Sequence, residues 1–216
     1  DFFEPDYLAI GIEVNLLQMN APASWPAYVS LHKATYEALK QDHPALPIFV
    51  TLTAVDLLEG WASADHGAQL AALAEILPYS DYLGLSFYPF MSAYLTEPIP
   101  ASTFDDLAAL AGGKPIAIGE SGYPAQETAL PSFGLVFSGT PEKQQGWIER
   151  LLREAESRQM PMVVQFVVRD YDALWQAIGA SDADAVWRDT GMYDEAGAAR
   201  PALDTWKAEL ARPRAP

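Results

Sequence analysis

Two glutamates, Glu13 and Glu120, each follow an apolar run that is bounded by turn-forming residues. The runs span residues 7–12 and 115–118, and both have the length and composition of a buried β-strand. A carboxylate at the tip of such a strand is costly to bury unless it is paired or hydrogen-bonded. Two carboxylates held together can share the work of cleaving a glycosidic bond, one as acid and the other as nucleophile or base.

The alternative for each glutamate is a solvated side chain at a strand end, without a chemical role. Gly119 and Gly122 flank Glu120, and glycines allow sharp turns and the close approach of other groups. Because Glu13 and Glu120 lie far apart in the sequence, only the fold can bring them together. A third interpretation makes the same two carboxylates the metal ligands of an unrelated α/β enzyme.

Composition narrows the class of protein. The chain has 216 residues, half of them apolar, so one domain with a proper core is the default. It has no cysteine, which excludes disulfides, Cys-ligated metals and a thiol nucleophile. The net charge is −16 without an intervening Lys/Arg cluster, which argues against nucleic-acid and anionic-membrane partners and suits a neutral substrate. No apolar run approaches the ~20 residues of a membrane helix.

Strand and helix patterns alternate along the chain. The strand candidates are almost continuous apolar runs, which indicates a parallel sheet covered by helices. The fold class expected is therefore α/β. Strands are predicted at 7–12, 47–53, 81–88, 115–118 and 162–168, helices at 24–41, 65–77, 103–111, 140–158 and 202–210, short helical turns at 173–178 and 183–188, and loops at 56–64 and 125–139.

Polar and aromatic side chains gather where these strands end, and parallel α/β folds bind ligands at the carboxyl ends of their strands. Aromatic faces offer flat apolar area to the C–H face of a sugar. For the tryptophans the alternative is packing, and for Asp170 it is turn capping. No histidine pair has metal-ligand spacing, and the chemistry needs no cofactor. The predicted substrate-binding residues are Asn15, Tyr88, Tyr123, Trp61, Trp175 and Asp170.

Four segments together resemble one known family. They are residues 10–15 (IGIEVN), 86–89 (SFYP), 118–124 (IGESGYP) and 191–203. In this order and spacing they are similar to strands four, six, seven and the closing stretch of the retaining (β/α)8-barrel glycoside hydrolases with two catalytic glutamates (clan A type). The galactanase- and mannanase-like families are nearest. The resemblance makes residues 1–216 the C-terminal portion, strands four to eight, of a single TIM-barrel catalytic domain.

The resemblance implies a retaining glycoside hydrolase that cleaves β-linked polysaccharides or oligosaccharides by double displacement. Glu13 would be the acid/base, Glu120 the nucleophile, and Tyr88 the hydroxyl that supports Glu120. A retaining mechanism requires the two carboxyl groups to lie about 5–5.5 Å apart.

The sequence departs from the family pattern at two points. Ile12 precedes Glu13 where the family usually has an Asn that contacts the substrate, and Asn15 is the candidate replacement because residues two apart on a strand share a face. This favours, as the alternative, a catalytically impaired carbohydrate-binding barrel. The chain also has only about five βα units, which cannot close an eight-stranded barrel. We expect the N-terminal half of the barrel, from the same gene product or a partner chain, to complete it.

Overall fold

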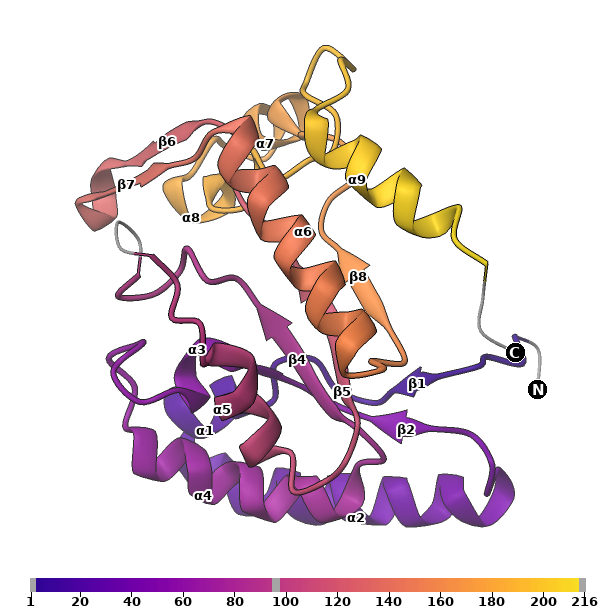
Figure 1. The fold of residues 1–216 in the computed structure, drawn as a ribbon. Coiled ribbons are helices and arrows are strands. Elements are labelled where there is room, and N and C mark those ends of the chain that lie inside the picture. The colour runs from indigo at the N-terminus through magenta and orange to yellow at the C-terminus, as the bar shows by residue number, and fades with distance from the viewer. Residues whose placement is uncertain (1–2, 95–97, 214–216) are drawn as a thin grey trace. The chain divides into compact units, whose positions relative to one another are not determined.

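The structure is a computed structural model that describes residues 3–94 and 98–213, and the chain divides into two units (Figure 1). Residues 95–97, within the segment between two predicted elements, lie outside the described residues. The first unit comprises Asp1–Phe87, Ile99–Gly119 and Arg158–Met162, and the second comprises Tyr88–Pro98, Glu120–Ser157 and Val163–Pro216.

The strands of the first unit are parallel where their pairing is defined. Strand β1 (Leu8–Ala9) pairs with β2 (Ile48–Phe49), and β3 (Thr51–Thr53) pairs with β4 (Leu83–Phe87). A single residue separates β2 from β3, so the two follow each other as one nearly continuous extended segment. The first residues of β5 (Ile116–Ser121) follow beside β4. The predicted parallel order is confirmed here, with strands shorter than expected.

Helices cover these strands. Figure 1 shows α2 and α4, which pack against each other, running side by side. The helices predicted at 24–41, 65–77 and 103–111 are confirmed to within a residue or two at either end. The first unit contains α1 (Asn15–Asn20), α2 (Trp25–Asp42), α3 (Ala54–Leu57), α4 (His66–Ile76) and α5 (Thr103–Leu110), with 3₁₀ turns η1 (Pro22–Ser24) and η2 (Leu77–Tyr79).

The core of the first unit lies under the sheet, where Phe49, Leu85 and Phe104 are almost completely buried. Burial of each such side chain contributes about 1.5–3 kcal/mol. The short helices α1 and α3 were not predicted from the sequence, because four to six residues show too little periodicity to identify a helix.

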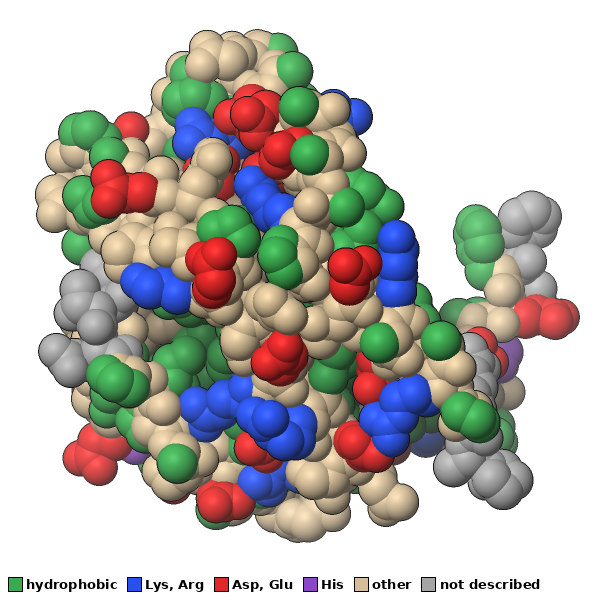
Figure 2. Space-filling view, turned by 45° about the horizontal axis from the view of Figure 1, so that its top comes forward, with side chains coloured by type: hydrophobic (Ala, Val, Ile, Leu, Met, Phe, Trp, Pro, Cys, Tyr) green, Lys and Arg blue, Asp and Glu red, His purple; other side chains and the backbone are tan. Residues whose placement is uncertain are grey.

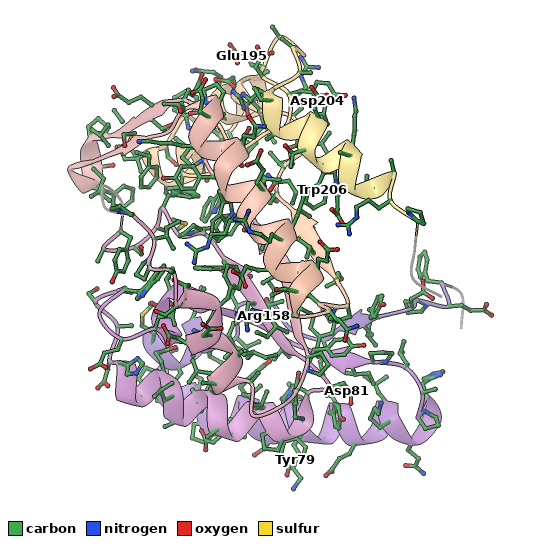
Figure 3. All side chains as sticks on the ribbon, in the orientation of Figure 1. Tyr79, Asp81, Arg158, Glu195, Asp204 and Trp206 are labelled. Carbon is green, nitrogen blue, oxygen red and sulfur yellow. The ribbon has the colours of Figure 1, made fainter. Side chains whose placement is uncertain are left out.

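Asp81, labelled in Figure 3, connects helix α2 to the strands. Its carboxylate accepts hydrogen bonds from the Tyr36 hydroxyl (2.8 Å), the Lys40 ammonium (3.1 Å) and the Ile48 N–H (2.7 Å). Burial opposes ionisation of Asp81, but these donors outweigh it and lower the pKa of its carboxyl group. The contact fixes α2 against the start of β2.

The second unit holds the end of β5 beside β8 (Val163–Gln165), where the Phe166 N–H donates to the Ser121 carbonyl at 2.7 Å. Two helices, α6 (Pro141–Ser157) and α9 (Pro201–Leu210), pack against each other, as Figure 1 shows. Their positions agree with the prediction, as do those of the two short turns, which become α7 (Asp172–Ala177) and α8 (Asp182–Ala185).

The prediction of a loop at residues 125–139 is wrong. These residues form an antiparallel hairpin of β6 (Glu127–Leu130) and β7 (Leu135–Ser138), joined by the 3₁₀ turn η3 (Pro131–Phe133). The inward side chains of Thr128, Leu130 and Phe137 are buried. Gly134 closes the turn with φ +64°, a conformation that favours glycine. Strands of four residues give too short an alternation to identify from the sequence.

Surface charge is mixed. Figure 2 shows Lys and Arg side chains interspersed with Asp and Glu over the visible face. Among residues 3–94 and 98–213, no helix combines the length and apolar character that crossing a bilayer requires.

Candidate active site

Glu13 lies in a tight turn just after β1, in the left-handed region with φ +50°. Its N–H donates to the Thr51 hydroxyl at 2.9 Å. A Cβ at Gly11 would lie 2.7 Å from Val14 Cγ1 and 2.8 Å from Tyr28 Oη, so the turn needs glycine there. The left-handed conformation costs a non-glycine residue about 1–2 kcal/mol, and such strained residues cluster at functional sites.

The half-buried Glu13 side chain borders a cavity of about 490 Å³ in the first unit. Ile12 and Leu16 also line it, so its wall is largely apolar. Ile12 is 66% exposed. The Tyr28 hydroxyl is buried and has no hydrogen-bond partner among the described residues, and burial raises the pKa of Tyr28 to about 12.

Asn15, two residues after Glu13, is completely buried. Its amide donates to Thr53 Oγ1 (2.7 Å) and Gln69 Oε1 (2.8 Å), and its carbonyl accepts from the Thr53 N–H (2.9 Å). These bonds use the amide inside the first unit, in place of the substrate contact that the sequence suggested. Asn15 thereby anchors the start of α1 to β3.

Trp61 is 5% exposed, and its ring lies 5.8 Å from that of Phe87, centroid to centroid. The indole is thus packed within the first unit. A sugar platform needs an open face, so in this structure Trp61 takes the packing role that was its alternative.

In the second unit, Tyr88 and Glu120 are brought together. The Tyr88 hydroxyl donates to Glu120 Oε2 at 2.9 Å, as the family resemblance implied. Tyr88 is 5% exposed, and its ring makes edge contacts with Phe90 (5.9 Å) and Trp187 (6.0 Å). Packing therefore fixes the Tyr88 hydroxyl. The Glu120 side chain is only half-buried, so its carboxylate can contact a ligand.

The backbone beside Glu120 is fixed from several sides. Ser121 is completely buried and accepts a hydrogen bond from Trp147 Nε1 at 3.0 Å. A Cβ at Gly122 would come 2.4 Å from the Phe166 carbonyl oxygen, so the approach of that backbone requires glycine. Together these contacts leave Glu120 little freedom to change direction.

Tyr123 is half-buried, and its ring lies 5.7 Å from that of Phe90. Burial raises the pKa of the Tyr123 hydroxyl. Its carbonyl accepts from the completely buried Gln144 amide, which also donates to the carbonyls of Thr190 and Gly191 (3.0–3.1 Å). Sequence reasoning missed Gln144, although a polar amide on the apolar face of the 140–158 helix was the available signal.

Asp170 forms a buried ion pair. Arg200 donates to its two oxygens at 2.9 and 2.6 Å, and the Gly191 N–H adds a bond of 2.8 Å. Burial raises the pKa of the Asp170 carboxyl group, and Arg200 opposes this rise. These bonds occupy the carboxylate, in place of the substrate contact that the sequence suggested.

Trp175 carries the Arg188 guanidinium over its ring, 4.5 Å from the centroid, and its Nε1 donates to the Ser181 carbonyl at 2.7 Å. One face is therefore covered by a cation. Within the described part of the chain, Asp170, Asp172 and Asp189 lie close enough to share a metal ion, but Arg188 pairs with the last two and Arg200 with the first. Each of the three carboxylates thus already has a guanidinium partner.

No family model matches the chain, and no curated protein matches it. Solved structures do. An endo-laminarinase from Formosa Hel1_33_131 is 16% identical, with a TM-score of 0.66 over 95% of this chain and 59% of that one. The glycoside hydrolase family 17 β-1,3-glucanosyltransferase from Rhizomucor miehei is 17% identical, with a TM-score of 0.59 over 94% and 64%.

A β-glucuronidase from Faecalibacterium prausnitzii is 16% identical, with a TM-score of 0.55 over 87% of this chain and 29% of that one. The chain thus spans less than two thirds of each of these proteins. The likeness establishes the fold, an α/β fold of the (β/α)8-barrel type, with about five βα units in this chain. It does not single out the galactanase- and mannanase-like families.

Proposed function

We propose that this chain carries the catalytic residues of a retaining glycoside hydrolase acting on β-linked polysaccharides or oligosaccharides. The observation that carries the proposal is the 2.9 Å hydrogen bond from the buried Tyr88 hydroxyl to the half-buried Glu120 carboxylate at the end of β5. A donor held in this way orients a carboxylate for attack and shares its charge. The barrel fold of glycoside hydrolases supports the same conclusion.

In the proposed mechanism the Glu120 carboxylate attacks the anomeric carbon while Glu13 protonates the leaving oxygen. The glycosidic C–O bond breaks, and a covalent ester joins the sugar to Glu120. Glu13, now ionised, takes a proton from water, which attacks the same carbon and releases Glu120. The mechanism requires the two carboxyl groups about 5–5.5 Å apart, which an experimental structure of the active protein would measure.

The proposed substrate is an uncharged β-glucan, with β-1,3-glucan first. Two of the proteins with similar folds are described as a laminarinase and a β-1,3-glucanosyltransferase. A neutral polymer avoids repulsion by a chain of net charge −16. β-Galactan and β-mannan, which the sequence resemblance favours, are the comparison substrates.

We also propose that residues 1–216 form the C-terminal portion of one catalytic domain, completed by the N-terminal half of a barrel. Five βα units cannot close eight strands, and an open sheet leaves unpaired edges. The exposed apolar side chains of Tyr7 (40%) and Ile12 (66%) beside β1 support this. Light scattering of the purified chain tests it, because a closed, monomeric 216-residue particle would contradict it.

The function is tested by release of reducing sugar from β-glucans. Glu120→Gln should abolish release without lowering the melting temperature, because the amide cannot attack the anomeric carbon. Glu127→Gln is the matched control, since Glu127 is an exposed glutamate on the outer face of β6. Unchanged turnover in Glu120→Gln would remove Glu120 from the mechanism.

A second candidate function is carbohydrate binding without catalysis. The exposed, apolar Ile12 beside Glu13 favours it, because an isoleucine cannot hydrogen-bond a sugar hydroxyl. Calorimetric binding of a β-glucan by wild type, with no reducing sugar released, would support this function over the first.

A further inference from the structure

We infer that Thr51 is a positioning residue for the proposed catalytic pair: it holds the backbone of Glu13 and packs against Gly119, the residue before Glu120. The inference rests on the proposed function. Thr51 lies at the start of β3, is 3% exposed, and belongs with Glu13 and Gly119 to the first unit.

Thr51 binds the Glu13 turn at three points. Its hydroxyl accepts from the Glu13 N–H at 2.9 Å, its carbonyl accepts from the Val14 N–H at 3.0 Å, and its N–H donates to the Gly11 carbonyl at 3.0 Å. The two backbone bonds only continue the strand pairing. The hydroxyl bond is different, because it depends on the side chain and ends on the residue proposed as acid/base.

The hydroxyl bond matters because Glu13 has φ +50°. A glutamate leaves the left-handed region unless surrounding contacts hold it there. Without the Thr51 oxygen, the Glu13 N–H loses the acceptor that it has in this conformation. Relaxation to negative φ would turn the side chain away from its present direction, so the proposed acid would no longer face the bond to be cleaved.

The other branch of the same side chain meets Gly119. A Cβ at Gly119 would lie 2.5 Å from Thr51 Cγ2, so the methyl group rests against the glycine backbone. Ser86 on the neighbouring strand β4 also contacts Thr51, and its Oγ lies 3.4 Å from Thr51 Oγ1. One threonine thus contacts the backbone of Glu13 and that of Gly119, the residue directly before Glu120.

Two substitutions separate these roles. Thr51→Val keeps the shape and the methyl contact with Gly119 but removes the acceptor for the Glu13 N–H. Thr51→Ser keeps the acceptor and removes the methyl group. Mispositioning of an acid affects only substrates whose leaving group needs a proton, which gives a readout that a purely structural role would not move.

The experiment measures kcat/KM on phenyl and dinitrophenyl β-laminaribiosides, because this constant reports the first chemical step. For Thr51→Val we expect a loss of roughly tenfold or more on the phenyl substrate, part of the usual contribution of a general acid. On the dinitrophenyl substrate, whose leaving group departs unprotonated, we expect less than about a threefold change. Thr51→Ser should restore the phenyl activity, and azide should accelerate turnover of the dinitrophenyl substrate by Thr51→Val.

Equal losses on both substrates, or no loss in an active protein, would overturn the inference. A wild-type protein that cleaves neither substrate would contradict the proposed β-1,3-glucan specificity instead. The inference would then still be decided by a crystal structure of Thr51→Val, in which the φ of Glu13 should leave the left-handed region. A Glu13 turn unchanged from wild type would refute the positioning role whatever the activity.

Discussion

Replacement of Tyr88 by phenylalanine is the most direct test of how Glu120 is held. The change removes one oxygen atom, the donor of the 2.9 Å bond to Glu120 Oε2. The ring would keep its edge contacts with Phe90 and Trp187, so the packing of the second unit should survive. We expect Tyr88→Phe to fold normally and to lose turnover.

The size of the loss follows from the burial of the hydroxyl. A hydrogen bond to a charged acceptor contributes about 1.5–3 kcal/mol, and Tyr88 is 5% exposed, so water cannot readily replace the donor. If that energy is realised fully in the transition state, kcat/KM falls by about 10- to 150-fold. The loss should be similar for phenyl and dinitrophenyl leaving groups, because Glu120 attacks in both reactions.

The assay is initial-rate hydrolysis of aryl β-laminaribiosides, with melting temperatures measured in parallel. Tyr171→Phe is the matched control, because its hydroxyl is also part-buried in the second unit but donates to the Asp184 carbonyl at 3.1 Å. Turnover of Tyr88→Phe within twofold of wild type would refute the support that we assign to this hydroxyl. An equal loss in Tyr171→Phe would show that the effect is one of folding.

Two further predictions concern stability. Gly119→Ala should lower the unfolding free energy by about 1–3 kcal/mol, because the new methyl group would overlap the Thr51 side chain, whereas Gly146→Ala, on the open surface of α6, should raise it by about 0.5–1 kcal/mol. Asp81→Asn should cost about 2 kcal/mol at neutral pH, since three donors lose their charged acceptor. The folded pKa of Asp81 lies below its ordinary value of 3.8, so its stabilisation is present above that pH and is lost as the pH falls through the folded pKa.

Urea unfolding measured across pH checks both predictions. The difference between wild type and Asp81→Asn should shrink in acid, and a constant difference would mean that the charge of Asp81 contributes little. For the glycines, the two alanine variants must move in opposite directions. A stable Gly119→Ala would show that Thr51 yields without cost, which would also weaken its proposed role.

Much of the first unit could be predicted from the sequence. The runs at 47–53 and 81–88 are continuous and apolar because both faces of a parallel strand are buried, and this pattern is independent of distant contacts. The contact between Tyr88 and Glu120 is implied by the family resemblance of residues 86–89 and 118–124. The strand pattern alone indicates only that both residues lie near the carboxyl ends of parallel strands, at the same edge of a sheet.

Whether the other candidate residues can contact a ligand depends on their hydrogen-bond partners within the protein. These partners are distant in the sequence, so no local pattern reveals them. Asn15 and Asp170 have the types expected of ligand-binding side chains, yet each is held by residues distant in the sequence, Thr53 and Gln69 for the first and Arg200 for the second. Gln144 is the converse case, a helix residue whose three acceptors lie on remote loops. Periodicity indicates which face of a helix is buried, but it does not indicate which polar groups that face will contact.

The Asp170–Arg200 pair has a consequence for the order in which the second unit assembles during translation. The two charges are 30 residues apart, and Arg200 directly precedes α9. Until the ribosome has released Arg200, burial of Asp170 would leave a lone charge in the interior, at a cost of about 3–5 kcal/mol. At usual rates of synthesis this delays completion of the unit by an interval on the order of seconds. The nascent chain therefore carries its proposed nucleophile strand well before the surroundings of that strand can close.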